Sequence, residues 1–404
     1  MIISPCVSLS SDIGLPHFNA LVAPIAKDTP TSLYTLTLYN RSYVLDLTGN
    51  LLWFRCRESH PQIPCRSHTC ITARSFQSLL CPPLVAVYKR PCCCVATPIN
   101  PITQTCAFGD LTTTNLTIFT TEGRAPLEPI AVPRFISSCA PKTLLGSLPS
   151  GAAGMAGLAR SRLALPTQLT AALSLPKQFA LCLPSEGGAS RGVAFFGGGP
   201  FVLLPPPGMD VTRVLTYAQL ARNQMNDDYY IDVKGVAVGG QLVRFLARVL
   251  VFDSLGRGGV KLSTAVPYTT LKSHCYRPFL EVFARATVGI PRVPALKPFN
   301  LCLNTSGVGR TRVGLAVPQI DLMMGSGKNW TILGANSMKQ VSKDVACLAI
   351  VDGGPKAEQA VVIGSFQMEN NFLLFDLARG LLGFSSSLLF FRTTCANFNF
   401  SSLR

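Results

Sequence analysis

Residues 43–53 read YVLDLTGNLLW, and this stretch decides the fold. Its first residues are the apolar and aromatic side chains of a buried strand. Asp46 ends that strand, and Gly49 follows in a segment suited to a tight turn. The stretch therefore predicts a strand that delivers one acidic side chain to a turn. We expect the Asp46 carboxylate to accept hydrogen bonds from that turn.

The pattern around Asp46 recurs in the second half of the chain. Residues 259–265 read GVKLSTA, so Ser263 follows an apolar strand where Asp46 stood before. The apolar-Gly segment 154–158 (GMAGL) likewise has a counterpart in 361–364 (VVIG). The offsets are similar, 217 residues from Asp46 to Ser263 and 207 residues from Gly157 to Gly364. Two patterns repeated at nearly one offset predict two homologous halves.

Short apolar runs and period-two alternation dominate the rest of the chain, which predicts a mostly β protein with few short helices. Plentiful glycine and proline (33 and 30 residues) favour many strands joined by turns. The segments predicted as strands are 32–38, 43–47, 116–120, 229–238, 246–252 and 372–376. The segments predicted as helices are 165–173 and 269–286.

The length of 404 residues exceeds one typical core and indicates two domains. The run Pro205-Pro206-Pro207-Gly208 suits neither a strand nor a helix, and it lies near the middle of the chain. We therefore predict an N-terminal lobe at 19–204, a linker at 205–208 and a C-terminal lobe at 209–404. Residues 1–18 are interpreted as an N-terminal extension or a truncated leader, because they make a poor signal peptide.

Fifteen cysteines indicate disulfides and an oxidising compartment, and the odd number leaves at least one thiol free or intermolecular. Five Asn-X-Ser/Thr triplets fit a secreted glycoprotein, with acceptors at Asn40, Asn115, Asn304, Asn329 and Asn399.

The net charge of +16 comes from scattered basic residues, so a nucleic-acid partner is not expected. No apolar run approaches the roughly 18 residues of a membrane span. The segment from Cys65 to Cys70 lacks a second ligand pair for zinc, so disulfides are favoured there and no metal or cofactor is expected.

These features together resemble the pepsin-like aspartic protease family. The resemblance extends from about Tyr34 to Ser385 and includes the Asp46 turn with Trp53, the strand around Tyr229 with Gly239-Gly240, and the closing 362–384 segment. It implies a bilobal fold, in which each lobe contributes an Asp-Thr/Ser-Gly turn that an apolar-apolar-Gly segment crosses. Here the second turn has Ser263, Thr264 and Ala265, and the first has Leu47, Thr48 and Gly49.

Loss of the second aspartate bears directly on catalysis. Two neighbouring carboxylates share a proton, so that one acts as base on a water while the other acts as acid. The Ser263 hydroxyl cannot take over either role. We therefore expect an inactive protein in which Asp46 is structural. The alternative is an unusual endopeptidase with residual activity.

A closer resemblance is to the plant TAXI-type xylanase inhibitors, the xyloglucanase inhibitors and the basic globulins of legume seeds. It rests on the opening 27–34 (KDTPTSLY), on 195–200 (FFGGGP), on 181–184 (LCLP) and on 328–338 (KNWTILGANSM). The resemblance implies a secreted, cell-wall, monomeric inhibitor of a microbial glycoside hydrolase, first of all an endoxylanase. A seed storage or peptide-binding globulin is the other alternative.

Such inhibitors place a loop in the substrate cleft of the target enzyme. Xylanase-inhibiting members use a histidine shortly before the last cysteine, whereas this chain has Phe390, Phe391 and Arg392 before Cys395. Arg392 could pair with a catalytic carboxylate and the two rings could fill sugar subsites. Equally, the three side chains could pack against the body of the protein.

The same family implies twelve paired cysteines. These are two of Cys92, Cys93 and Cys94, together with Cys56, Cys65, Cys70, Cys81, Cys106, Cys139, Cys182, Cys302, Cys347 and Cys395. Cys6, Cys275 and the third member of the triplet are then left over.

Overall fold

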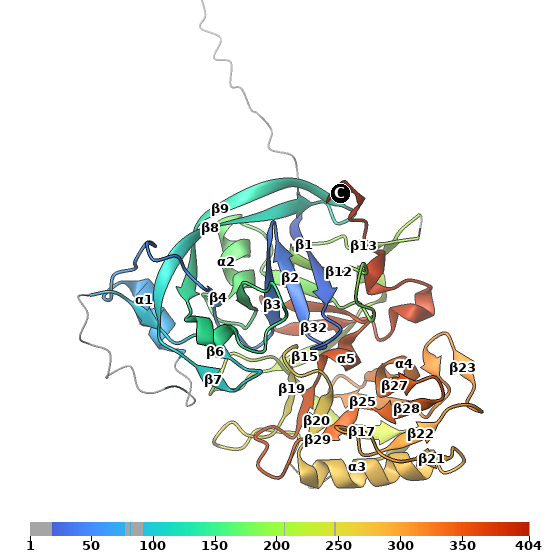
Figure 1. Ribbon diagram of the computed structural model, residues 1–404. Coiled ribbons are helices and arrows are strands. Elements are labelled where there is room, and N and C mark those ends of the chain that lie inside the picture. The colour runs from blue at the N-terminus through green and yellow to red at the C-terminus, as the bar shows by residue number, and fades with distance from the viewer. Residues whose placement is uncertain (1–17, 77–80, 82–91, 206, 246–247, 404) are drawn as a thin grey trace, which may run out of the picture.

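The computed structural model describes residues 18–76, 81, 92–205, 207–245 and 248–403, and it is mostly β (Figure 1). Cys6 and nearly all of the predicted N-terminal extension lie outside these ranges. The first half comprises β1 (Ala20–Lys27), β2 (Tyr34–Leu38), β3 (Arg41–Asp46), β4 (Leu52–Phe54), α1 (His68–Arg74), β5 (Val95–Ala96), β6 (Ile99–Asn100), β7 (Thr105–Cys106), β8 (Gly109–Thr121), β9 (Pro126–Cys139), η2 (Lys142–Leu145), β10 (Gly154–Gly157), α2 (Leu165–Ala172), β11 (Gln178–Cys182), β12 (Gly192–Gly197) and β13 (Val202–Leu203).

The second half follows the same style of short strands and has one long helix. Its elements are β14 (Met209–Asp210), η3 (Val211–Val214), β15 (Thr216–Ala221), β16 (Tyr230–Ile231), β17 (Val233–Val238), β18 (Gln241–Leu242), β19 (Val260–Leu262), β20 (Thr269–Leu271), α3 (Ser273–Ala286), β21 (Arg292–Val293), β22 (Cys302–Asn304), β23 (Arg310–Thr311), β24 (Gly314–Leu315), β25 (Ile320–Met324), β26 (Asn329–Ile332), α4 (Gly334–Ser337), β27 (Met338–Ser342), β28 (Val345–Leu348), β29 (Ile350–Asp352), β30 (Val361–Ile363), α5 (Ser365–Met368), β31 (Phe372–Asp376), β32 (Leu381–Phe384), η4 (Leu388–Phe391), η5 (Cys395–Asn397) and η6 (Ser401–Leu403).

The internal repeat of the sequence appears as a repeated strand arrangement. In the first half β10 lies between β3, which is parallel to it, and β4, which is antiparallel. In the second half β30 lies in the same way between parallel β19 and antiparallel β20. The match extends outward, because β4 pairs with parallel β9 and β20 with parallel β29. The prediction of two homologous halves is therefore confirmed.

The two halves share one sheet of eighteen strands among the described residues. The connection between them is made by the antiparallel pair β11 and β31, and β32 and β15 continue the sheet from there. Aromatic side chains fill the junction, where the ring centroids of Phe179 and Phe375 are 4.6 Å apart and those of Tyr229 and Phe375 are 4.7 Å apart. Figure 1 shows β8 and β9 arching over one half while α3 lies along the opposite end of the molecule.

Two predictions of secondary structure are wrong. The segment predicted as a helix from Thr269 begins with strand β20, because its β-branched residues pair with β29 and β30, and the helix starts only at Ser273. The strand predicted at 246–252 is, over its described residues, a turn and bend at 248–251, where Arg248 has a left-handed backbone (φ 70°), followed by an isolated bridge from Phe252 to Gly258. Apolar composition alone predicted a strand there, but the turn leaves Val251 49% exposed.

The segment 205–208 connects β13 to β14, which pair with each other as a hairpin; Pro206 lies outside the described residues. The lobe boundary at this place stays a prediction. Among the described residues, no helix combines the length and the apolar character needed to cross a membrane.

Candidate functional site

Asp46 ends β3 and lies beside β10, whose Gly157 is its direct neighbour in the parallel pair. The backbone N–H of Leu158 donates to the Asp46 carbonyl at 2.8 Å, which fixes the end of the strand. Close approach here requires glycine, because a Cβ on Gly157 would lie 2.4 Å from the carbonyl oxygen of Gly49. Two strands and a glycine contact thus hold the Asp46 turn rigidly.

The Asp46 side chain is 3% exposed and accepts hydrogen bonds from its own turn. Both the backbone N–H and the hydroxyl of Thr48 donate to its Oδ1, at 2.9 and 2.7 Å. Burial raises the pKa of Asp46; the Thr48 hydrogen bonds and the nearby charge of Lys261 oppose this rise, while Asp228 adds to it. Asp46 therefore has the contacts expected of a structural acid in a tight turn.

The structure brings the second turn against the first. The Thr264 hydroxyl donates to the Leu45 carbonyl at 2.7 Å and accepts from the Leu47 N–H at 3.1 Å. Ser263 is buried next to it, with its N–H donating to the Ile363 carbonyl at 3.0 Å. The second turn bonds to the first through the Thr264 hydroxyl. The first turn has Leu47 at the corresponding position, and this residue has no hydroxyl that could bond to the second turn. Ala265 is also buried.

Two further charged residues near Asp46 were not predicted from the sequence. Lys261, two residues before Ser263 on β19, forms an ion pair with Asp228 at 2.7 Å. Burial lowers the pKa of Lys261, but Asp228, Tyr230 and Asp46 together raise it above its ordinary value, so the ammonium group stays charged. The sequence signal that could have revealed this charged site is Lys261 itself, a lysine inside an otherwise apolar strand. Because Asp228 is bound to this ammonium group, it is not a free partner for Asp46.

A cavity of about 90 Å³ lies beside Asp46. It is lined by the Asp46 turn, by Trp53 of β4, by Ala73 and Phe76, and by the segment that leads into the β6–β7 hairpin. The Trp53 Nε1–H donates to the Ile99 carbonyl at 3.1 Å, which ties that hairpin over the turn. All the lining residues belong to the first half of the chain, so neither Ser263 nor the C-terminal loop contributes to it.

The C-terminal loop, defined as residues 387–394, exposes all three residues singled out in the sequence. Phe390 and Phe391 are 54% and 43% exposed, and Arg392 is also exposed. Arg392 has a left-handed backbone (φ 57°) and ends the short helix η4. Residues 390–392 therefore project from the surface, while Leu388 and Thr393 on either side of them are buried.

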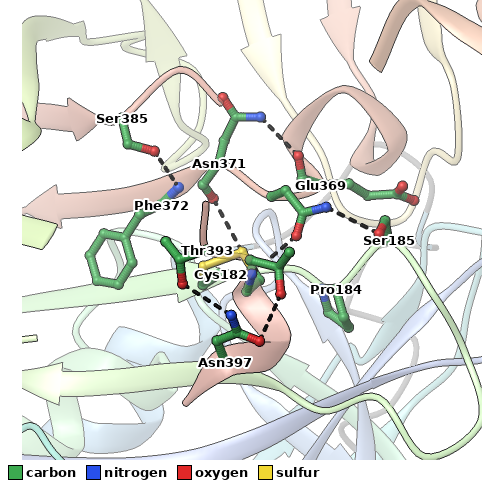
Figure 2. The surroundings of a disulfide bond; sticks show 12 residues. Cys182, Pro184, Ser185, Glu369, Asn371, Phe372, Ser385, Thr393 and Asn397 are labelled. Carbon is green, nitrogen blue, oxygen red and sulfur yellow. Dashed lines mark hydrogen bonds between the residues drawn. A yellow bond between two sulfur atoms is a disulfide. The ribbon is translucent and has the colours of Figure 1, made fainter. Parts of the chain in front are cut away.

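Strong anchors hold both ends of this loop. Leu388 is fully buried, and its N–H donates to the Asn370 carbonyl at 2.8 Å. At the other end Cys395 forms a disulfide with Cys182 of β11, and its N–H donates to Asn370 Oδ1 at 3.0 Å. Figure 2 shows the surroundings of that disulfide, where Asn397 donates to the Thr393 hydroxyl.

The remaining cysteines follow the family framework. The bonds join Cys56 to Cys139, Cys65 to Cys92, Cys70 to Cys94, Cys81 to Cys106, and Cys302 to Cys347. Within the described residues, Cys93 and Cys275 are the free thiols. Burial raises the pKa of the Cys275 thiol to about 11, so this group is unreactive at neutral pH. His60 lies close to Cys56 and Cys139, whose sulfur atoms are already bonded to each other.

The five glycosylation candidates differ in exposure. Asn40, Asn115 and Asn329 are exposed, while Asn304 and Asn399 are half-buried. The Oδ1 atoms of Asn304 and Asn399 also accept backbone hydrogen bonds within their own turns, from Ser306 and Ser401. The first three are therefore the more accessible acceptors.

Comparison with known proteins identifies the family. Residues 37–198 match the family model "Xylanase inhibitor N-terminal" and residues 228–386 match "Xylanase inhibitor C-terminal". The chain is 43% identical over 424 residues to chitinase CLP of Oryza sativa subsp. japonica, covering 99% of this chain and 97% of that protein. It is 37% identical over 402 residues to gamma conglutin 1 of Prunus dulcis, covering 95% and 90%.

Solved structures agree with this assignment. The crystal structure of edgp superimposes with a TM-score of 0.88 at 36% identity, covering 96% of this chain and all of the other. An aspartic proteinase from Irpex lacteus shares the fold, with a TM-score of 0.55 at 13% identity over 94% of this chain. The chain therefore belongs to the TAXi xylanase-inhibitor family and has the bilobal fold of the pepsin-like aspartic proteinases.

Proposed function

We propose that this protein is a catalytically inactive relative of the aspartic proteinases that inhibits a microbial cell-wall-degrading glycoside hydrolase, with an endoxylanase as its first target. The inhibitory element is the C-terminal loop, which enters the substrate cleft of the enzyme. The match to two xylanase-inhibitor family models supports this choice of partner.

The absence of a second catalytic carboxylate supports the inactive state. Ser263 precedes Thr264, whose hydroxyl bonds the backbone on both sides of Asp46, and the nearby Asp228 is bound to Lys261. A single buried carboxylate cannot share a proton with a partner, and so cannot supply both the base and the acid. A peptide-cleavage assay at acidic pH should show no turnover above that of an Asp46→Ala variant. Turnover that pepstatin and Asp46→Ala both abolish would identify an endopeptidase instead.

The exposed, doubly anchored C-terminal loop is the observation that carries the inhibitory role. Two largely exposed phenylalanines beside an arginine are unusual on a surface unless a partner covers them. The Arg392 side chain has no hydrogen-bond or ion-pair partner among the described residues, so its planar guanidinium group is available for a carboxylate. Anchoring at Leu388 and Cys395 reduces the entropy that the loop would lose on binding.

Steady-state inhibition kinetics test this proposal. Purified endoxylanases, xyloglucanases and chitinases would be assayed with the intact protein, and at least one should be inhibited competitively. Arg392→Ala should weaken that inhibition about tenfold or more, the usual effect of losing a charged hydrogen bond. Arg285→Ala is the matched control, because Arg285 is an exposed arginine on α3. Absence of inhibition across the panel at micromolar concentration would favour a storage or peptide-binding globulin.

The proposal includes secretion to the cell wall. The six disulfides among the described residues are typical of an oxidising compartment, and three exposed glycosylation triplets are compatible with passage through the secretory pathway. Mass spectrometry of the protein isolated from its natural tissue tests both features. Reduced cysteines throughout, with no glycan at Asn40, Asn115 or Asn329, would contradict this location.

A further inference from the structure

The cavity beside Asp46 combines an apolar wall with a charged hydrogen-bond acceptor. Leu51, Trp53 and Ile99 supply the apolar wall, and Asp46 supplies the acceptor. One water molecule needs roughly 10–15 Å³ of such space, so about 90 Å³ has room for several heavy atoms. The cavity is therefore large enough for a small ligand group as well as for water.

Two acceptors beside this cavity lack donors. Thr48 donates twice to Asp46 Oδ1, whereas no described residue donates to Oδ2. The Oδ1 of Asn50 is buried and has no hydrogen-bond partner among the described residues. Buried polar atoms are nearly always paired in folded proteins. Asn50 Oδ1 is closed off from the cavity, so Asp46 Oδ2 is the acceptor that a ligand can reach, and its charge favours a cationic donor.

We infer that this cavity binds a primary ammonium group on a short alkyl stem, either a free alkylamine or a lysine side chain of another protein. An ammonium group offers three donors and no acceptor, which matches a site that offers an acceptor. Its charge complements the Asp46 carboxylate, while Leu51 and Ile99 contact the stem. An alcohol has one donor and no charge, and a carboxylate would be repelled.

The charges around the cavity favour this ligand at neutral pH. Asp46 is influenced by Asp228 and Lys261, which neutralise each other in their ion pair. Among the described residues, the other segments that line the cavity, namely β4, the end of α1 with Phe76, and 97–101, bring no titratable side chain to it. Because burial raises the pKa of Asp46, the carboxylate becomes protonated at a higher pH than an ordinary aspartate, and binding of the cation should be lost as the pH falls through that pKa.

Ligand-observed NMR titration of the intact protein tests the inference. At neutral pH n-butylammonium should bind at least about tenfold more tightly than n-butanol, as expected for a charge-assisted hydrogen bond. Asp46→Asn should abolish that preference. Asp321→Asn is the matched control, since Asp321 is a buried acid that does not line the cavity, and it should leave the preference unchanged.

The remaining outcomes are also decisive. If a Gly-Lys-Gly peptide competes with n-butylammonium, the site accepts a lysine side chain; if it does not, the ligand is a free amine. Equal affinity for n-butanol and n-butylammonium, or an unchanged preference in Asp46→Asn, would overturn the inference. Should Asp46→Asn fail to fold, the wild-type protein decides the question, because its preference for the ammonium ion must disappear on acidification. The site shares no residue with the C-terminal loop, so these results are independent of inhibition.

Discussion

The second turn depends on one hydroxyl group. Thr264 donates to Leu45 and accepts from Leu47, so a single side chain joins the two turns. Thr264→Val keeps the shape but leaves both backbone groups without that partner. We expect a loss of about 1–3 kcal/mol in the free energy of unfolding. Chemical denaturation measures it, with Thr264→Ser as the control that keeps the hydroxyl; equal stability of the valine and serine variants would show that the contact is unimportant.

Asp46 determines part of the pH dependence of stability. Burial raises its pKa above the value in the unfolded chain, so its stabilising effect is complete below the unfolded pKa of about 3.9 and is lost as the pH rises through the folded pKa. The Asp46→Asn variant has no ionisable group at this position, so it should not lose stability in this way as the pH rises. At neutral pH the variant should be at least as stable as the wild type in urea unfolding, and the two curves should converge near pH 3. Lower stability of the variant at neutral pH would mean that the charged form is favoured instead.

At the scale of elements, the close packing of β10 against the Asp46 turn requires a glycine. A Cβ on Gly157 would lie 2.4 Å from the Gly49 carbonyl oxygen and 2.5 Å from that of Leu51. We expect Gly157→Ala to destabilise the protein by more than about 3 kcal/mol, or to prevent folding. Gly289→Ala, where nothing lies within 4 Å of the added Cβ, should change thermal stability little. Similar melting temperatures for both variants would contradict the packing.

The sequence predicts elements well where local pattern and pairing agree. The stretch 372–376 is β31 as predicted, because it is a short apolar run buried on both faces, and 165–172 is helix α2. The two wrong predictions have different causes. Residues 269–271 pair with β29 and β30, which are distant in the sequence. The described residues 248–251 form a local turn, in which the Val251 N–H donates to the Arg248 carbonyl. The pairs between β20 and β29 join residues about 80 positions apart, which a local pattern does not contain.

At the candidate site, too, the sequence reveals local patterns but not contacts between residues distant in the chain. Asp46 and Ser263 are recognisable because each ends an apolar strand in a repeated pattern. The ion pair between Lys261 and Asp228 spans 33 residues and depends on the pairing of β16 with β19. The exposure of Phe390 and Phe391 depends on how the chain turns after Leu388, so the sequence left packing and projection equally open.

At the scale of the whole molecule, the disulfide between Cys182 and Cys395 joins residues 213 positions apart and fixes the C-terminal segment to β11. Replacing both cysteines by alanine should cost about 2–5 kcal/mol of stability, because the unfolded chain gains freedom. It should also weaken inhibition, since one anchor of the C-terminal loop is lost. Cys93→Ser is the control, because Cys93 is a free thiol. Full inhibition by the double variant would show that the loop is held without this bond.

The bilobal fold of a two-aspartate protease is retained here, while the proposed activity lies on a different surface. In this proposal the Asp46 turn is not catalytic, and the C-terminal loop is the part that contacts the partner enzyme. The two regions share no described lining residue, so substitutions in one should leave the other unaffected.

The most direct measurement compares xylanase inhibition by wild-type protein, Asp46→Asn and Arg392→Ala under one set of conditions. Asp46→Asn should inhibit as the wild type does, and Arg392→Ala should inhibit more weakly by about tenfold or more. Inhibition that is abolished by Asp46→Asn and unaffected by Arg392→Ala would contradict this proposal.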